Sequence, residues 1–248
     1  ENRVYRQMFG QDTLRMCELT GTRFLLGLGQ GHVSYLDAIY GRTNSFAEHL
    51  LFSLGPKEPG KEIKSYDDVA VSIQTNGPLA LIEFHGALPR AGLFANWRSG
   101  LSDDEVLATL PRKTWNPHQE VLIAEEIPVS ETSDTNAPVV SANYESYDPK
   151  RIMLSTEAVT STVLLLNDKH HPAWKVTVDG KPAKLLRANY LMRGVHLPAG
   201  KHKVEFQFAP SENSIRVSLA GFGLGALAVL ILVFLPRSET TDPLDDPE

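Results

Sequence analysis

The residues between 217 and 235 constrain the fold of this chain more than any other stretch. They read VSLAGFGLGALAVLILVFL, without a charged side chain, and Arg216 and Arg237 stand close to either end. As a helix the stretch would be about 28 Å long, close to the bilayer's hydrocarbon thickness of about 30 Å. Its apolar side chains surround the whole circumference, whereas a buried helix of this length normally keeps a polar face. The pattern predicts a transmembrane helix over residues 215–236; the alternative is a buried core helix.

The segments at the two ends of the chain are polar. Residues 237–248 are acidic and contain prolines, which predicts a disordered tail. The chain begins at Glu1 and shows no positively charged segment followed by an apolar one, so we expect it to be part of a longer protein. Arginines flank the apolar stretch symmetrically, so the positive-inside rule does not orient it.

Composition and motifs exclude several classes of function. The chain has 24 Lys and Arg against 30 Asp and Glu, and its basic residues form no stripe with aromatics between them, so we expect no nucleic-acid partner. Cys17 is the single cysteine, which excludes an internal disulfide and a cysteine-based metal site. The motifs of serine hydrolases, phosphate-binding loops and zinc peptidases are also missing. We therefore expect no catalytic residue, metal ion or cofactor in this chain.

A polar run at residues 130–138 predicts a soft domain boundary. Residues 1–130 before it mix helix and strand signals and predict an α+β region. Residues 13–28 open as a helix and pass into a strand, and Ser102 predicts the start of a short helix that ends at Pro111. A hairpin is expected from strands at residues 67–74 and 79–84, joined by a turn at Asn76-Gly77-Pro78.

Residues 138–210 predict an all-β, sandwich-like domain. Trp174, Val176 and Val178 alternate with polar residues, and Asp179-Gly180 is a two-residue turn signal. Turn residues recur at intervals of about ten, as they do in sandwiches. Strands are expected at residues 152–154, 161–166, 174–178, 181–186, 190–197 and 204–208.

Several stretches of the chain resemble the C-terminal domain of bacterial YfhO-family membrane proteins. HHPAWKVTVDGK at 170–181 resembles the family's aromatic strand with its Val-Asp-Gly turn. RANYLMRGV and LPAGKH, between 187 and 202, resemble its Asn-containing strand and its Leu-Pro-Ala-Gly-x-His turn. LTGTRFLL at 19–26 and ALPRA at 87–91 extend the resemblance over most of residues 14–236.

This resemblance implies a polytopic glycosyltransferase of the GT-C kind in a bacterial cytoplasmic membrane. Such proteins transfer a sugar from a polyprenyl-phosphate carrier to a cell-envelope acceptor, and their catalytic acid lies between early membrane helices. The chain would then be the non-catalytic, extracytoplasmic C-terminal portion together with the last membrane helix. Its partners would be the lipid bilayer, the N-terminal membrane helices of the same protein, and a polyprenyl-phosphate sugar or envelope glycan. The alternatives are a membrane-anchored carbohydrate-binding module and a purely structural β domain.

Seven side chains are candidates for a ligand or interface role. Arginine suits phosphate because its planar fork bonds two oxygens at once, and an exposed tryptophan offers a flat surface to a sugar ring. Each has a structural alternative: Trp174 as part of the core, Arg90 in an ion pair, and the 187–193 group as a polar interface or plain solvent-facing surface. The candidates are Arg90, Trp97, Arg98, Trp174, Arg187, Asn189 and Arg193.

Overall fold

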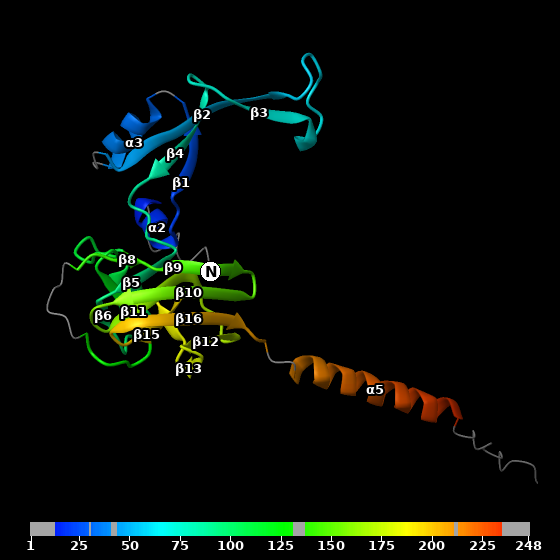
Figure 1. Ribbon diagram of the computed structural model, residues 1–248. Coiled ribbons are helices and arrows are strands. Elements are labelled where there is room, and N and C mark those ends of the chain that lie inside the picture. Colours follow the sequence, from blue (N-terminus) through cyan, green and yellow to red (C-terminus); the bar gives the residue numbers. More distant parts are fainter. Residues whose placement is uncertain (1–12, 30, 41–43, 131–136, 211–212, 235–248) are drawn as a thin grey trace, which may run out of the picture. The chain divides into compact units, whose positions relative to one another are not determined.

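A computed structural model describes residues 13–29, 31–40, 44–130, 137–210 and 213–234. Most of the predicted boundary run at 130–138, and the whole predicted tail at 237–248, lie outside the described residues. The chain divides into two compact units, Glu1–Phe208 and Ala209–Glu248. The first unit contains an N-terminal sheet with two helices and, after it, a larger domain built on two sheets (Figure 1).

The N-terminal sheet is antiparallel and has the strand order β1-β4-β2-β3. Gly21 has a φ of 64° and ends the first helix in the left-handed conformation that glycine tolerates, so the chain turns directly into β1. The predicted helix and strand within residues 13–28 are thus confirmed. The elements are α2 (Thr13–Thr20), β1 (Phe24–Leu28), α3 (His32–Tyr40), β2 (Phe46–Pro56), a 3-10 turn η1 (Tyr66–Asp68), β3 (Val69–Ile73) and β4 (Leu79–Phe84).

The predicted hairpin between β3 and β4 is wrong, because β2 lies between the two strands. Phe52 of β2 pairs with Ile73 of β3 on one edge and with Leu79 of β4 on the other. The intervening residues therefore cross over β2 at Phe52, where a Cβ on Gly77 would lie 2.4 Å from the Phe52 carbonyl oxygen. Asn76-Gly77-Pro78 makes this close crossing rather than a hairpin turn.

The two-sheet domain consists of two five-stranded sheets, ordered β13-β12-β16-β10-β9 and β14-β15-β11-β5-β8. In Figure 1, β16 lies between β10 and β12 in the first of these sheets. The first sheet contains β9 (Asn143–Asp148), β10 (Arg151–Ala158), β12 (Trp174–Val178), β13 (Lys181–Ala183) and β16 (Gly200–Phe208). The second contains β5 (Ala91–Phe94), β8 (Val140–Ser141), β11 (Thr162–Lys169), β14 (Leu186–Ala188) and β15 (Met192–Leu197).

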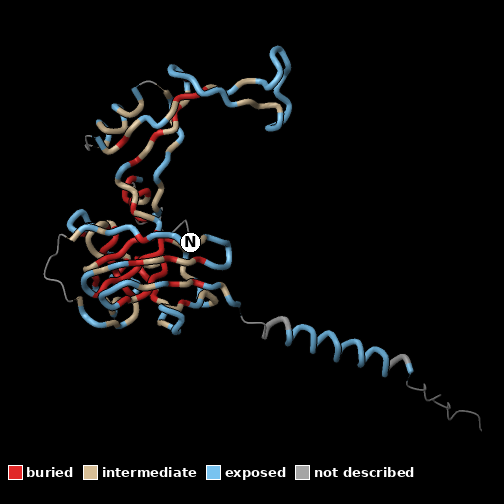
Figure 2. Tube along the Cα trace, in the orientation of Figure 1, coloured by how far each residue is buried: buried red, intermediate tan, exposed pale blue. Residues whose placement is uncertain are grey.

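Both faces of the second sheet are buried. Leu164 and Leu166 of β11 pack with residues of the first sheet in one core, and Val163 and Leu165 pack into a second core on the opposite face. The second core is closed by β6 (Asn96–Arg98), α4 (Asp103–Thr109) and β7 (Glu120–Leu122). Figure 2 shows this concentration of buried residues in the two-sheet domain. The β-rich character predicted for this domain is confirmed.

Two local features of the domain follow from its turn residues. Ser102 accepts a hydrogen bond from the Glu105 amide and caps α4, as predicted. Asp179 and Gly180 both have positive φ and join β12 to β13. The predicted single strand at 181–186 is wrong, because β13 ends at Ala183 and Leu186 begins β14 in the other sheet.

The predicted boundary near residue 130 separates strands that share a sheet. β5, which precedes it, pairs with β11, which follows it, through Phe94 opposite Val163. The division into domains at that point stays a prediction.

The second unit contains the helix α5 (Asn213–Phe234), whose side chains are described at residues 216–231 and 234. Its large apolar side chains are exposed, among them Leu219, Phe222 and Leu230. Among the residues that are described in full, no helix combines the length and the apolarity needed to cross a membrane.

Candidate functional site

The candidate site centres on Asp168, near the end of β11. The pairing of β11 with β15 is regular up to Leu166 and resumes at Lys169, so Asp168 lies in an irregularity of the ladder. Its two carboxylate oxygens take different partners. Oδ1 accepts a hydrogen bond from Arg90 at 3.1 Å, and Oδ2 accepts one from Arg193 at 3.1 Å.

Arg193 is the buried member of this cluster, with a side chain that is only 4% exposed. Its guanidinium also donates to the Lys169 carbonyl at 2.8 Å and lies 4.0 Å from the centre of the Trp174 ring. Burial lowers the pKa of Arg193, and the attraction of Asp168 opposes that shift. Its Nε has no hydrogen-bond partner among the described residues.

Arg90 is the exposed member, and it contacts Asp168 from the other side. Its guanidinium lies 4.2 Å from the centre of the Tyr147 ring and donates to the Tyr147 hydroxyl. Burial would lower the pKa of Arg90, but Asp168 and the neighbouring tyrosines raise it overall. Burial raises the pKa of Tyr144, which packs against Tyr147, to about 12. The Tyr144 phenol is therefore neutral at physiological pH.

A shallow hollow of about 370 Å³ opens beside this cluster. Trp174 packs edge to face against Phe208 with 5.3 Å between ring centres, and His171 lies 5.7 Å from Phe208. Trp174 also lines a second hollow, of about 510 Å³, towards β13. The first hollow is lined by Tyr147, Pro149, Ile152, Asp168, Lys169, His171, Trp174, Arg193 and Phe208.

The structure brings three of the seven candidate residues together, namely Arg90, Trp174 and Arg193. Arg187 pairs with Arg193 across β14 and β15, but its guanidinium contacts Asp103 and its backbone amide donates to Glu125.

The remaining three candidates make structural contacts. The Trp97 indole is buried and donates to the Pro128 carbonyl at 2.9 Å. Arg98 forms an ion pair with Glu120 at 2.9 Å on the β6–β7 ribbon. Asn189 is buried, and its side-chain oxygen accepts from the Leu122 amide at 3.0 Å. A ligand role for any of the seven stays a prediction.

Sequence reasoning missed Asp168, Tyr147, His171 and Phe208. The one signal for Asp168 was its position directly after the apolar run of β11, where a charged residue ends a buried strand. The other three come from the 143–148 strand, the 170–173 loop and the end of β16, and nothing local connects them.

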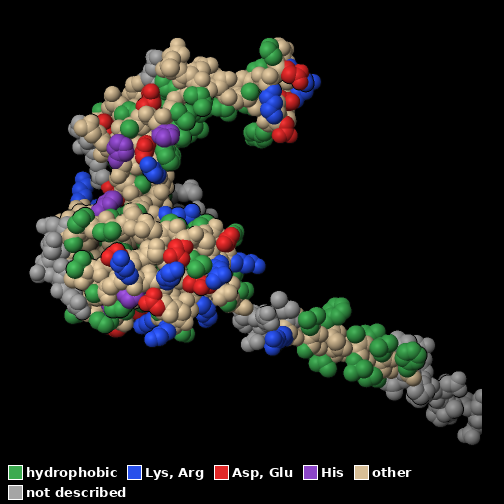
Figure 3. Space-filling view, in the orientation of Figure 1, with side chains coloured by type: hydrophobic (Ala, Val, Ile, Leu, Met, Phe, Trp, Pro, Cys, Tyr) green, Lys and Arg blue, Asp and Glu red, His purple; other side chains and the backbone are tan. Residues whose placement is uncertain are grey.

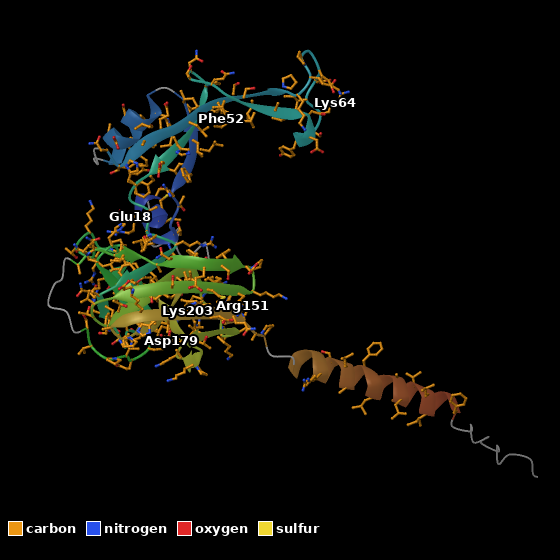
Figure 4. All side chains as sticks on the ribbon, in the orientation of Figure 1. Glu18, Phe52, Lys64, Arg151, Asp179 and Lys203 are labelled. Atoms are coloured by element: carbon orange, nitrogen blue, oxygen red, sulfur yellow. The ribbon has the colours of Figure 1, made fainter. Side chains whose placement is uncertain are left out.

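A second polar cluster lies at the other end of β16. Asp179 accepts from the His202 Nδ1 at 2.7 Å and from the Lys203 amide at 2.8 Å, and it borders a hollow of about 550 Å³. Figure 4 shows Asp179 and Lys203 in this part of the domain. These bonds tie the Val-Asp-Gly turn to the Pro-Ala-Gly-x-His turn, so we assign them a structural role. Among the described residues, no three His, Cys, Asp or Glu side chains gather in a group that could hold a metal ion.

Part of the chain matches a known protein family. Residues 143–218, from β9 into the start of α5, match the sequence profile of the family described as bacterial membrane protein YfhO. The resemblance predicted from the sequence is confirmed over this stretch, and the chain is accordingly membrane-associated. No curated protein matches significantly.

Among solved structures, the chain is similar to the arabinofuranosyltransferase AftD from Mycobacteria. In one cryo-EM structure the identity is 18% over 68% of this chain, with a TM-score of 0.29. In a structure of a mutant form of that protein, the sequence identity is 26% over 44% of this chain, with the same TM-score of 0.29. The matched region covers 12% and 9% of those two proteins, so this chain spans a small part of their length.

Proposed function

We propose that this chain is the non-catalytic, extracytoplasmic C-terminal portion of a polytopic membrane glycosyltransferase. The parent enzyme would use a polyprenyl-phosphate-linked sugar to glycosylate the cell envelope. The family match over β9–β16 supports the membrane part of this proposal. The resemblance of 170–202 and the chemistry of the hollow beside Trp174 support the sugar-handling part.

The observation that carries the proposal is the combination of groups around the Trp174 hollow. Sugar rings have an apolar CH face that packs on aromatic side chains and hydroxyls that bond charged groups. Trp174, Phe208 and Tyr147 supply the aromatic surface, while Asp168 can accept and Arg193 can donate hydrogen bonds. The buried Arg193–Asp168 pair would hold these groups in place before a glycan binds.

The helix α5 is proposed to be the last membrane helix of the parent protein. Counted over all 22 residues, including the five whose side chains are not described, α5 would be about 33 Å long, which matches a hydrocarbon thickness of about 30 Å. Residues 217–235 carry no charge, and Figure 3 shows apolar side chains along the visible face of α5. A membrane-impermeant thiol reagent tests the orientation in intact cells. The exposed Lys175→Cys variant should be labelled from outside, and labelling only after lysis would contradict an extracytoplasmic domain.

Calorimetric titration of the full chain in detergent with arabinan, galactan and mannan oligosaccharides tests the hollow. Binding of at least one of these glycans is expected. Trp174→Ala should weaken it about tenfold or more, as loss of a central aromatic contact does. Lys201→Ala, at an exposed pair with Glu157, is the matched control and should bind like the unmodified chain. If Trp174→Ala retains full affinity while folded, the hollow is not the site.

A membrane-anchored carbohydrate-binding module is the second candidate, because the same hollow would serve it. The glycosyltransferase proposal and the binding-module proposal differ in the activity that they give to the parent protein. Deleting residues 88–210 from the parent should abolish sugar transfer from polyprenyl phosphate if the first proposal holds. Glycan binding in a parent without any transferase activity would favour the second.

A further inference from the structure

The N-terminal sheet has one covered face and one open face. Leu14 and Cys17 of α2, and Val33 and Leu36 of α3, pack with Ile82 and its neighbours on the covered face. Residues that pair directly across antiparallel strands point to the same side, so the register defines which residues make up the other face.

Three rows of apolar residues cross the open face. Leu28, Leu79, Phe52 and Ile73 pair in sequence and form one row across all four strands. A second row runs through Leu26, Leu81 and Leu50, and a third joins Leu54 to Val71. The first charged residue on this face is Glu83 at its end, where it is paired with Arg23.

The open face is exposed where its strands lie at the edges of the sheet. Leu26 is 73% exposed, Ile73 is 76% exposed and Val71 is 63% exposed. Figure 2 shows that much of the β2–β3 hairpin is exposed. On the opposite side of that hairpin Ser53 pairs with Ser72, so the hairpin itself is amphipathic. Exposed aliphatic side chains gathered on one face of a sheet mark an interaction surface.

We infer that this open face lies on the surface of a lipid bilayer, with its aliphatic side chains among the acyl chains. Residues 143–218 match a family of bacterial membrane proteins, so a lipid bilayer is the surface that we expect next to this chain. The rows offer no side-chain hydrogen-bonding group, whereas protein interfaces typically carry about one hydrogen bond per 100–200 Å². At the tip of the hairpin, Tyr66 is 98% exposed and Ile63 and Lys64 are also exposed, in a loop that carries both lysines and acidic residues. Tyrosine and lysine are the side chains that favour the headgroup region.

Fluorescence quenching in vesicles tests this placement with adjacent residues that face opposite ways. Ile73→Cys and Leu54→Cys place a label on the open face, while Ser72→Cys and Ser53→Cys place it on the other side of the same hairpin. Each full-length variant carries an environment-sensitive thiol label and is reconstituted in phosphatidylethanolamine–phosphatidylglycerol vesicles with brominated acyl chains. Cys17 is buried, and the labelling of the unmodified chain measures its contribution.

Lipid contact predicts an alternating pattern along the hairpin. Labels at 54 and 73 should be quenched about twofold or more relative to vesicles without bromine, and labels at 53 and 72 should not, because an interfacial element inserts only about 5–10 Å. Equal, water-like emission at all four positions would overturn the inference. Blue-shifted emission at 54 and 73 without quenching would also overturn it, because a protein surface would then cover the face. Circular dichroism of each variant verifies that the sheet is folded.

Discussion

At the scale of single residues, Asp168 shows how burial separates two otherwise similar ion pairs. Arg193 has almost no access to water, so its positive charge depends on Asp168 and on the Lys169 carbonyl for its solvation. Arg90, whose side chain is 53% exposed, keeps much of its hydration. Removing one partner of a buried pair is costly, whereas an exposed pair contributes little.

Replacing Asp168 should therefore cost much more stability than replacing Arg90. We expect Asp168→Ala to lower the free energy of unfolding by about 3 kcal/mol, because Arg193 is left buried without its carboxylate. Arg90→Ala should lower it by about 1 kcal/mol or less. Urea unfolding followed by tryptophan fluorescence measures both values. Equal losses would show that Arg193 is solvated in some other way.

Asp179 should make the stability of the domain depend on acid. The hydrogen bonds from His202 and from the Lys203 amide hold the pKa of Asp179 below its ordinary value of 3.8. The folded chain then binds fewer protons than the unfolded chain, so this stabilisation is complete above the ordinary pKa and is lost as the pH falls through the lowered one.

The Asp179→Asn variant should accordingly lose less stability on acidification than the unmodified chain. The difference should develop below about pH 4, in urea titrations at successive pH values. Identical pH dependence of the two proteins would mean that the Asp179 bonds do not persist in solution.

At the scale of elements, the crossing at Gly77 decides the order of the N-terminal sheet. A Cβ at this position would lie 2.5 Å or less from the Phe52 nitrogen and carbonyl oxygen, and neither can move without breaking the β2 pairings. Gly55, in the same strand β2, has nothing within 4 Å of the corresponding point. The two glycines therefore form a matched pair.

Gly77→Ala should destabilise the chain by about 1–3 kcal/mol, as forced overpacking does. Gly55→Ala should change the stability by no more than about 1 kcal/mol, and in the stabilising direction if it changes at all. Thermal unfolding by circular dichroism distinguishes them. A neutral Gly77→Ala variant would mean that the 74–78 segment does not cross β2 closely.

At the scale of the whole molecule, the two-sheet domain needs residues from before the predicted boundary. β5 contributes a strand to the second sheet, and Phe94, Val106 and Val121 close the core on its outer face. A fragment of residues 138–210 would expose that face of β11, which carries Val163 and Leu165.

We therefore expect residues 1–210 to melt cooperatively and residues 138–210 not to do so. The shorter fragment lacks the apolar surface that covers one side of its central sheet, and packing of both faces is what stabilises such a sheet. Calorimetric melts of the two fragments measure the difference. A cooperative melt of 138–210 would place the boundary where the local composition suggests it.

Local sequence patterns determined the features that depend on near neighbours. The α2 helix, the Ser102 cap, the Asp179-Gly180 turn and the alternation of Trp174–Val178 follow from side-chain chemistry within a few residues, and the structure contains all of them. The uncharged run at 217–235 is equally a property of the sequence by itself. Motifs between 170 and 202 indicated the resemblance to the YfhO family, whose profile matches residues 143–218.

Tertiary structure alone decided which distant strands pair. Nothing near residue 76 reveals that β2 comes between β3 and β4, and nothing near Ala183 reveals that the chain changes sheets there. Asp168, Tyr147 and Phe208 lie on three separate strands, and pairing across sixty residues brings them to one hollow. Side-chain preferences act over a few residues, whereas strand order and sites depend on how all the apolar faces are buried together.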